Sequence, residues 1–142
     1  MSPQALLIVV VGLAGGVGQK NAADDQKELQ GTWAVDSLES NGKLISPDTT
    51  DKLKVIIDGK KLIFKGQSSD EEMTFRLAPT KKPREIDLIS TDKKVGTLEG
   101  IYSLEGDKLT ICYGRKEKDR PQEFVTKSGD RRVLMVLSRE KR

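Results

Sequence analysis

The segment Leu98–Tyr113 reads LEGIYSLEGDKLTICY, in which apolar side chains recur at every second position on both sides of one turn. A period of two is the pattern of a half-buried β-strand. Glu105-Gly106-Asp107 forms a turn between the two runs. The segment therefore predicts two antiparallel strands, with buried faces formed by Leu98, Gly100, Tyr102 and Leu104 and by Leu109, Ile111 and Tyr113.

The same period continues through most of the chain past residue 30. It predicts further strands at Thr32–Leu38, Lys54–Ile57, Lys61–Lys65, Met73–Leu77, Glu85–Leu88, Phe124–Thr126 and Val133–Leu137. The turn Asp58-Gly59-Lys60 joins two of them into a hairpin. The apolar run of Val133–Leu137 is continuous, which indicates burial on both faces or a position where a barrel closes. About nine short strands joined by turns favour a barrel or sandwich over alternating helices and strands.

Helices have little room in this pattern. Asp24–Leu29 (DDQKEL) predicts one or two N-terminal turns, and Ser46-Pro47 places a capping hydroxyl before a proline suited to the first helical position. Any helix over Pro47–Leu53 is short. We therefore predict an all-β fold, a single antiparallel up-and-down barrel of about eight or nine strands with one short helix. An eight-stranded barrel is at the size where side chains either fill the interior or leave a small cavity.

Composition limits the chemistry that the chain can perform. Its 142 residues suit one domain, and 25 Lys and Arg against 22 Asp and Glu leave a net charge of only +3. The sequence contains no histidine, so the commonest general base and the commonest zinc ligand are missing. Its single cysteine, Cys112, cannot form an internal disulfide or a cysteine metal cage.

Residues 1–23 differ from the rest of the chain. An apolar run at Ala5–Val11 (ALLIVVV) precedes small residues, and Ala14 or Gly16 suits a cleavage point. About a dozen apolar residues are too few for a membrane-spanning helix, which needs about 20. We therefore predict a signal peptide at 1–23 and a mature domain at 24–142. The alternatives are a buried N-terminal strand or an uncleaved anchor, because Met1–Gln4 contains no Lys or Arg. No cysteine follows the run, which argues against a lipoprotein.

Gly31-Thr32-Trp33 resembles the Gly-x-Trp signature of lipocalin-like barrels. In that family the tryptophan closes the bottom of the barrel, and a basic residue from the last strand packs over its ring. The resemblance therefore implies that Trp33 and Arg139 form a structural closure. A cation over an indole contributes roughly 0.5–2 kcal/mol.

Five motifs together are similar to a narrower group, an uncharacterised and often secreted paralogous domain family of planctomycete-type bacteria. The resemblance covers about residues 28–138 and implies a lipocalin-like barrel, but it supplies no catalytic residues. Its motifs are Leu29–Trp33, Pro83–Leu88, Gly100–Leu104, Leu109–Tyr113 and Arg120–Phe124.

Several residues are candidates for a site, although each also has a structural interpretation. Tyr102 and Tyr113 would lie across from each other if their strands pair, and core packing is the simpler role for both. Arg120 is a candidate anion contact, but a structural corner that pairs with Asp87, Asp119 or Glu123 is the preferred interpretation. The candidate ligand-lining residues are Trp33, Val35, Phe75, Tyr102, Tyr113 and Phe124.

Catalytic and metal chemistry find little support. Cys112 falls on an outward face and is interpreted as a structural thiol. Asp70-Glu71-Glu72 reads as a solvated acidic loop rather than a calcium site, because the EF-hand pattern is missing. Gly12–Gly18 lacks the Gly-Lys-Ser/Thr ending of a phosphate-binding loop. We predict no catalytic residues, metal or cofactor.

The sequence therefore predicts an exported, non-enzymatic barrel that binds a small apolar or amphipathic molecule or an envelope protein. The competing interpretation is a structural or interaction module with a filled barrel, and a hydrolase without histidine is third. The basic segment 127–142 has no interleaved aromatic residues, so nucleic-acid binding is not expected. We predict a monomer with no stable membrane span.

Overall fold

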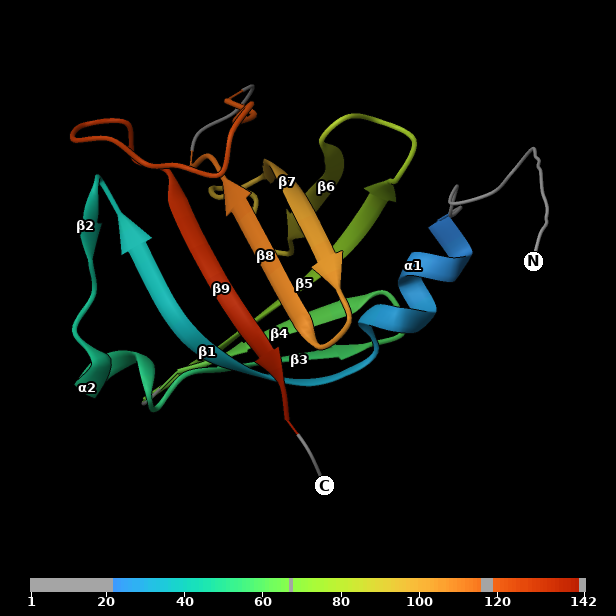
Figure 1. Cartoon of the computed structure of the whole chain (residues 1–142), viewed down its shortest axis with the longest axis horizontal. Coiled ribbons are helices and arrows are strands. Elements are labelled where there is room, and N and C mark those ends of the chain that lie inside the picture. The colour runs from blue at the N-terminus through green and yellow to red at the C-terminus, as the bar shows by residue number, and fades with distance from the viewer. Residues whose placement is uncertain (1–21, 67, 116–118, 141–142) are drawn as a thin grey trace, which may run out of the picture.

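Nine antiparallel strands form one sheet in the computed structural model, which describes residues 22–66, 68–115 and 119–140 (Figure 1). Eight of them surround a closed barrel: β1 (Gly31–Ser40), β3 (Lys54–Asp58), β4 (Lys61–Lys65), β5 (Asp70–Ala78), β6 (Arg84–Ser90), β7 (Thr97–Glu105), β8 (Lys108–Tyr113) and β9 (Val133–Arg139). Each pairs with the next along the chain, and β9 pairs with β1 to close the barrel. The predicted all-β barrel is thus confirmed.

The ninth strand is not the one that the sequence predicted. Phe124 and Thr126 belong to the long connection between β8 and β9, in which residues 119–132 form no strand. The extra strand is β2 (Lys43–Leu44), which pairs with the end of β1. Phe124 and Thr126 are less exposed than their neighbours Glu123 and Val125. A connection that packs against the barrel can therefore show the same alternation over a few residues as a strand.

Glycine turns form two of the predicted hairpins. Gly59 has a φ of 62° between β3 and β4, and Gly106 has a φ of 59° between β7 and β8. Side chains other than Gly, Asn and Asp rarely adopt this left-handed conformation. The closing pairs, Asp58–Lys61 and Glu105–Lys108, leave two-residue loops in both cases.

The barrel interior is filled by the alternating apolar side chains of all eight strands. Val133–Leu137 lies at the predicted closure, where β9 pairs with β8 on one side and β1 on the other. The most deeply buried interior side chains include Trp33, Val55, Leu62, Phe75, Ile86, Leu88, Tyr102, Leu109, Ile111, Met135 and Leu137, each at most 3% exposed. This filled interior gives the fold a rigid core, as close packing does in proteins generally.

Two helices accompany the barrel in the part of the chain that the structure describes. The helix α1 (Ala22–Leu29) precedes β1, and its Leu29 is buried in the core (Figure 1). The short helix α2 (Pro47–Thr50) begins after Ser46, whose hydroxyl accepts a hydrogen bond from the Asp48 backbone at 3.3 Å. Ser46 is thus the predicted N-cap. The predicted leader lies outside the described residues, except for its last two residues, which begin α1.

Part of the outer barrel face is also buried. Ile101 and Cys112 point outward on β7 and β8, yet they are at most 1% exposed. The connection that contains Pro121 lies over them, and the Cys112 thiol donates a hydrogen bond to the Val125 carbonyl at 3.7 Å. Because the connection covers their outer face, β7 and β8 contain apolar residues on both faces, whereas a strand with an exposed outer face needs them only on the inner one.

Candidate functional site

One end of the barrel is closed by Trp33 and Arg139. The Arg139 guanidinium lies 4.3 Å from the Trp33 ring centroid and donates hydrogen bonds to the Gln30 carbonyl at 2.8 Å and the Glu28 carbonyl at 2.5 Å. The Trp33 indole N–H donates to the Leu29 carbonyl at 2.8 Å. These contacts attach α1 and its following turn to both closing strands.

A buried polar cluster lies beside this closure. Asp25 of α1 is fully buried, and one of its carboxylate oxygens accepts hydrogen bonds from the Tyr102 hydroxyl and from Arg84 at 3.1 Å. The other oxygen, Oδ1, is buried with no hydrogen-bond partner. Arg84 also lies 5.2 Å from the Tyr102 ring centroid and donates to the Leu104 carbonyl at 3.3 Å. The cluster connects α1, β6 and β7.

This environment shifts the titration of Tyr102. Burial raises the pKa of the Tyr102 hydroxyl, and both the hydrogen bond to Asp25 and the charge of that carboxylate raise it further. The charge of Arg84 opposes the shift without cancelling it. Tyr102 therefore remains a neutral hydrogen-bond donor over the physiological pH range.

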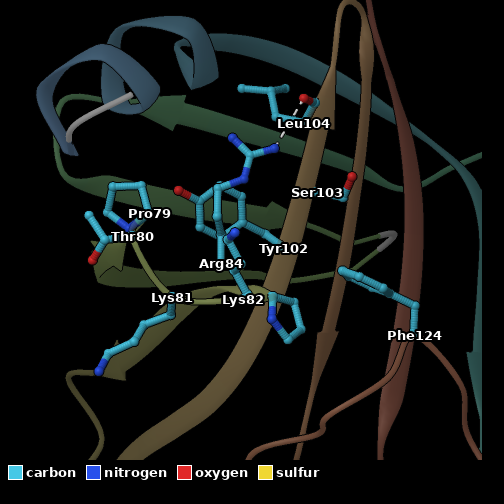
Figure 2. A pocket seen from close by; sticks show the side chains of 10 residues that line it. Pro79, Thr80, Lys81, Lys82, Arg84, Tyr102, Ser103, Leu104 and Phe124 are labelled. Atoms are coloured by element: carbon cyan, nitrogen blue, oxygen red, sulfur yellow. Dashed lines mark hydrogen bonds between the residues drawn. The ribbon is translucent and has the colours of Figure 1, made fainter. Parts of the chain in front are cut away.

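A hollow of about 530 Å³ opens next to the cluster (Figure 2). Arg84, the first residue of β6, pairs with Tyr102 of β7. The β7 residues after Tyr102 have no partner in β6, and the hollow forms beside them. The turn that connects β5 to β6 supplies the opposite wall. The lining residues are Pro79, Thr80, Lys81, Lys82, Pro83, Arg84, Tyr102, Ser103, Leu104 and Phe124.

The hollow combines apolar walls with positive charge. Lys81 and Lys82 are exposed at its rim, and Arg84 is half-buried. Among the described residues, no carboxylate belongs to its lining. Figure 2 shows the Arg84 side chain over the Tyr102 ring, with its guanidinium directed toward Leu104. The arrangement suits a ligand that offers an apolar body and a negative charge.

The predicted ligand-lining residues do not surround one cavity. Trp33, Val35, Phe75 and Tyr102 are buried among other core side chains. The tyrosines are not direct partners, since Tyr102 pairs with Ile111 and Tyr113 with Gly100. Of the six, only Tyr102 and Phe124 line the hollow.

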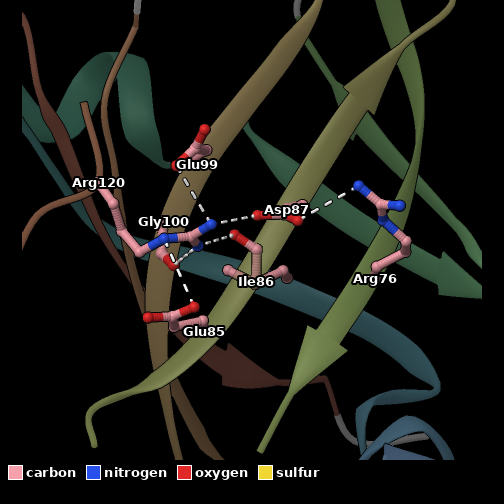
Figure 3. A network of polar contacts seen from close by, with 7 residues as sticks. All are labelled: Arg76, Glu85, Ile86, Asp87, Glu99, Gly100 and Arg120. Atoms are coloured by element: carbon pink, nitrogen blue, oxygen red, sulfur yellow. Dashed lines mark hydrogen bonds and ion pairs between the residues drawn. The ribbon is translucent and has the colours of Figure 1, made fainter. Parts of the chain in front are cut away.

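Arg120 fixes the long connection to the outer face of β6 and β7 (Figure 3). Its guanidinium lies 2.7 Å from Asp87, 3.3 Å from Glu99 and 3.6 Å from Glu85, and it donates to the Gly100 carbonyl at 2.8 Å. Three carboxylates surround one cation, so their negative charge disfavours the approach of an anion. The preferred interpretation of Arg120 as a structural corner agrees with this geometry, and the pairing with Asp87 is present.

The remaining candidates are placed away from the hollow. Burial raises the pKa of the Cys112 thiol to about 11, which suits an inert structural thiol. Asp70 begins β5 and lies 3.4 Å from Lys65, and Glu72 lies 3.8 Å from Lys61. Within the described residues no three potential metal ligands gather, and no helix is long and apolar enough to cross a bilayer.

Sequence reasoning missed Asp25, Arg84 and the two lysines of the rim. Arg84 belongs to the motif Pro83–Leu88, and Asp25 belongs to the predicted helix Asp24–Leu29. Neither pattern indicates that these two side chains contact each other. A carboxylate inside a predominantly polar helix gives no signal of burial until the helix is placed against the barrel. Comparison with known proteins adds no assignment, because no family model, curated protein or solved structure matches this chain.

Proposed function

We propose that this chain is an exported, non-enzymatic barrel protein that binds a small amphipathic anion in the hollow beside Arg84. The main support for this proposal is the size and lining of the hollow. Its volume of about 530 Å³ lies within the ~300–1,000 Å³ of typical small-molecule sites. Pro79, Leu104 and Phe124 offer apolar contacts, while Lys81 and Lys82 offer positive charge.

The barrel interior is a poorer candidate for the ligand. Trp33, Phe75 and Tyr102 occupy it and are at most 3% exposed. Admitting a ligand there would require several core side chains to move, and displaced core packing is costly. The packed barrel instead supports the strands and the turn that line the hollow.

Three observations support the exported, non-enzymatic part of the proposal. The apolar run Ala5–Val11 followed by small residues is typical of a secretory leader. The motif resemblance is to a family that is often secreted. The sequence contains no histidine, and its one thiol, Cys112, is buried with a raised pKa.

A filled interaction module is the second candidate, favoured by the same packed interior. Leu44 is 71% exposed and Val125 is 41% exposed, and both are large apolar side chains. In this alternative they contact an envelope protein, and the hollow has no ligand.

The test uses a fluorescent anilinonaphthalene sulfonate, which is an amphipathic anion. We expect saturable binding to the native protein and a loss of binding of about tenfold or more in the double variant Lys81→Glu, Lys82→Glu. The matched control is Lys93→Glu, Lys94→Glu, another exposed lysine pair, which should bind like the parent.

Absence of saturable binding, or equal loss in both double variants, would count against the hollow as a ligand site. Native mass spectrometry of the gently extracted protein gives an independent readout, since a bound amphipathic anion adds a discrete mass. Cell fractionation tests export separately: recovery of the full-length protein from the cytoplasm alone would refute it.

A further inference from the structure

A second hollow lies at the opposite end of the barrel. It has a volume of about 370 Å³ and is lined by Ser40, Asn41, Arg115 and Arg131. Ser40 ends β1, seven residues beyond Trp33, and pairs with Val133 at the start of β9. The hollow is therefore separated by the length of the barrel from the closure at Arg139.

The two arginines of this hollow differ from the others that the structure describes. Each of the other five has a carboxylate partner: Arg76 and Arg120 with Asp87, Arg84 with Asp25, Arg132 with Asp119, and Arg139 with Asp107. Within residues 22–66, 68–115 and 119–140, neither Arg115 nor Arg131 has an ion pair, although both line one small hollow. Both side chains are exposed, and two guanidinium groups that share a concave site attract an anion to the space between them.

The backbone of Arg131 is held in place by a hydrogen bond that it donates to a distant hairpin. Arg131 has a φ of 58°, an unusual value for a residue with a long side chain. Its N–H donates to the Asn41 side-chain carbonyl at 2.8 Å, and Asn41 itself has a φ of 53° in the turn between β1 and β2. Residues held in this region persist only where surrounding structure determines them, and they concentrate at functional sites.

A second contact fixes the same two segments to each other. The Thr126 hydroxyl accepts a hydrogen bond from the Gly42 N–H at 2.8 Å and donates to Glu39 at 2.6 Å. The Asp130 carboxylate accepts hydrogen bonds from the backbone N–H groups of Lys127 at 2.6 Å and Arg132 at 2.9 Å. Glu39 and Asp130 therefore take part in these hydrogen bonds, and among the residues that the structure describes no carboxylate lines the hollow.

We infer that this hollow binds a tetrahedral oxyanion, of the phosphate or sulfate type, between Arg115 and Arg131. Each guanidinium presents paired N–H donors that match two oxygens of such a group. The Ser40 hydroxyl and the Asn41 side-chain amide add neutral donors from the hairpin wall. The oxyanion is either free in solution or part of a lipid headgroup, since both offer the same chemistry.

The test titrates the full chain with inorganic phosphate at constant ionic strength and follows backbone amide signals by NMR. We expect saturable shifts concentrated at Asn41 and Arg131. The variants Arg115→Gln and Arg131→Asn should each weaken binding at least about tenfold. Asparagine is chosen at position 131 because it tolerates a positive φ. The control Arg76→Gln removes an equal charge from an exposed site and should leave binding unchanged.

Vesicles distinguish the sources of the oxyanion. Binding to vesicles that contain phosphatidic acid, but not to pure phosphatidylcholine, together with the same dependence on Arg115 and Arg131, identifies a lipid headgroup. Binding to inorganic phosphate alone identifies a free oxyanion. The inference is overturned if no saturable shift appears across the millimolar range, or if Arg76→Gln weakens binding as much as the two site variants. Unfolding followed by Trp33 fluorescence verifies that each variant is folded.

Discussion

Arg139 and Trp33 are direct partners across the β1–β9 pairing, and the guanidinium lies 4.3 Å from the indole ring centroid. The same guanidinium donates to two carbonyls at the end of α1 and the turn that follows it. One side chain therefore joins the first strand, the last strand and the N-terminal helix. Because β1 and β9 are adjacent only in the closed barrel, the loss of this contact should measure how much it stabilises barrel closure.

Replacing Arg139 with Met should destabilise the protein by about 2 kcal/mol. The change removes the cation–π contact and leaves the carbonyls of Gln30 and Glu28 without their donor. Urea unfolding followed by the fluorescence of Trp33, the single tryptophan, measures the effect. Arg76→Met at an exposed position is the control, and equal destabilisation by both variants would contradict a role in closure.

Replacing Arg120 with Met should destabilise the protein by about 2–4 kcal/mol, because Asp87, Glu99 and Glu85 lose the cation between them. Arg76→Met breaks only an exposed pair with Asp87 at 3.4 Å and should cost less than about 1 kcal/mol. The difference between the variants should shrink as the pH falls toward about 4, where carboxylates gain protons. Chemical denaturation at several pH values measures it, and a difference that grows on acidification would disprove the electrostatic explanation.

Alkaline pH should destabilise the protein through Tyr102. Burial, followed by the interactions with Asp25, raises the pKa of this hydroxyl in the folded state. The stability that it contributes is fully present below the unfolded pKa of about 10 and is lost as the pH rises above that value. The expected loss is about 1.4 kcal/mol per pH unit for one proton.

Tyr102→Phe should remove this part of the pH dependence. The variant should also be less stable at neutral pH by about 1–3 kcal/mol, because Asp25 loses a buried donor. Tyr113 remains in the variant, and its pKa is raised by burial to about 12, so some alkaline destabilisation persists. Denaturation curves from about pH 8 to 11 measure the slope; an unchanged slope in Tyr102→Phe would falsify the assignment.

Cys112 should resist thiol reagents in the folded protein. It is fully buried, and its pKa is raised to about 11, so the reactive thiolate is scarce at pH 8. A chromogenic disulfide reagent should label it only on unfolding. The double variant Cys112→Ala, Val125→Cys places the thiol at an exposed position on the covering connection and should react promptly. Prompt labelling of the native parent would show that the connection does not cover Cys112.

Much of the fold could be predicted from local pattern. The interior face of each strand is buried, so the alternation of Leu98, Gly100, Tyr102 and Leu104 survives in the sequence even though Ile101 on the outer face is also buried. The turns at Gly59 and Gly106 are equally local, because positive φ angles select glycine. Phe124 was assigned to a strand for the same reason, since a residue that covers the outer barrel face alternates with exposed neighbours as a strand residue does.

The candidate sites could not be predicted in this way. Asp25, Arg84 and Tyr102 come from a helix and two strands, and their meeting depends on how α1 lies against the barrel end. Arg115 and Arg131 likewise share a hollow although they lie at opposite ends of the connection between β8 and β9, and the Asn41 side chain holds the backbone of Arg131 there.

By itself, the sequence determined the eight barrel strands, the turns at Gly59 and Gly106 and the absence of histidine, because backbone preference and the burial of one strand face act over a few residues. Only the tertiary structure decided that the interior is filled, where the two hollows lie, and which of the described arginines have a carboxylate partner. The physical reason is that charge compensation and cavity volume depend on side chains brought together by barrel closure, whose spacing along the chain carries no periodic signal.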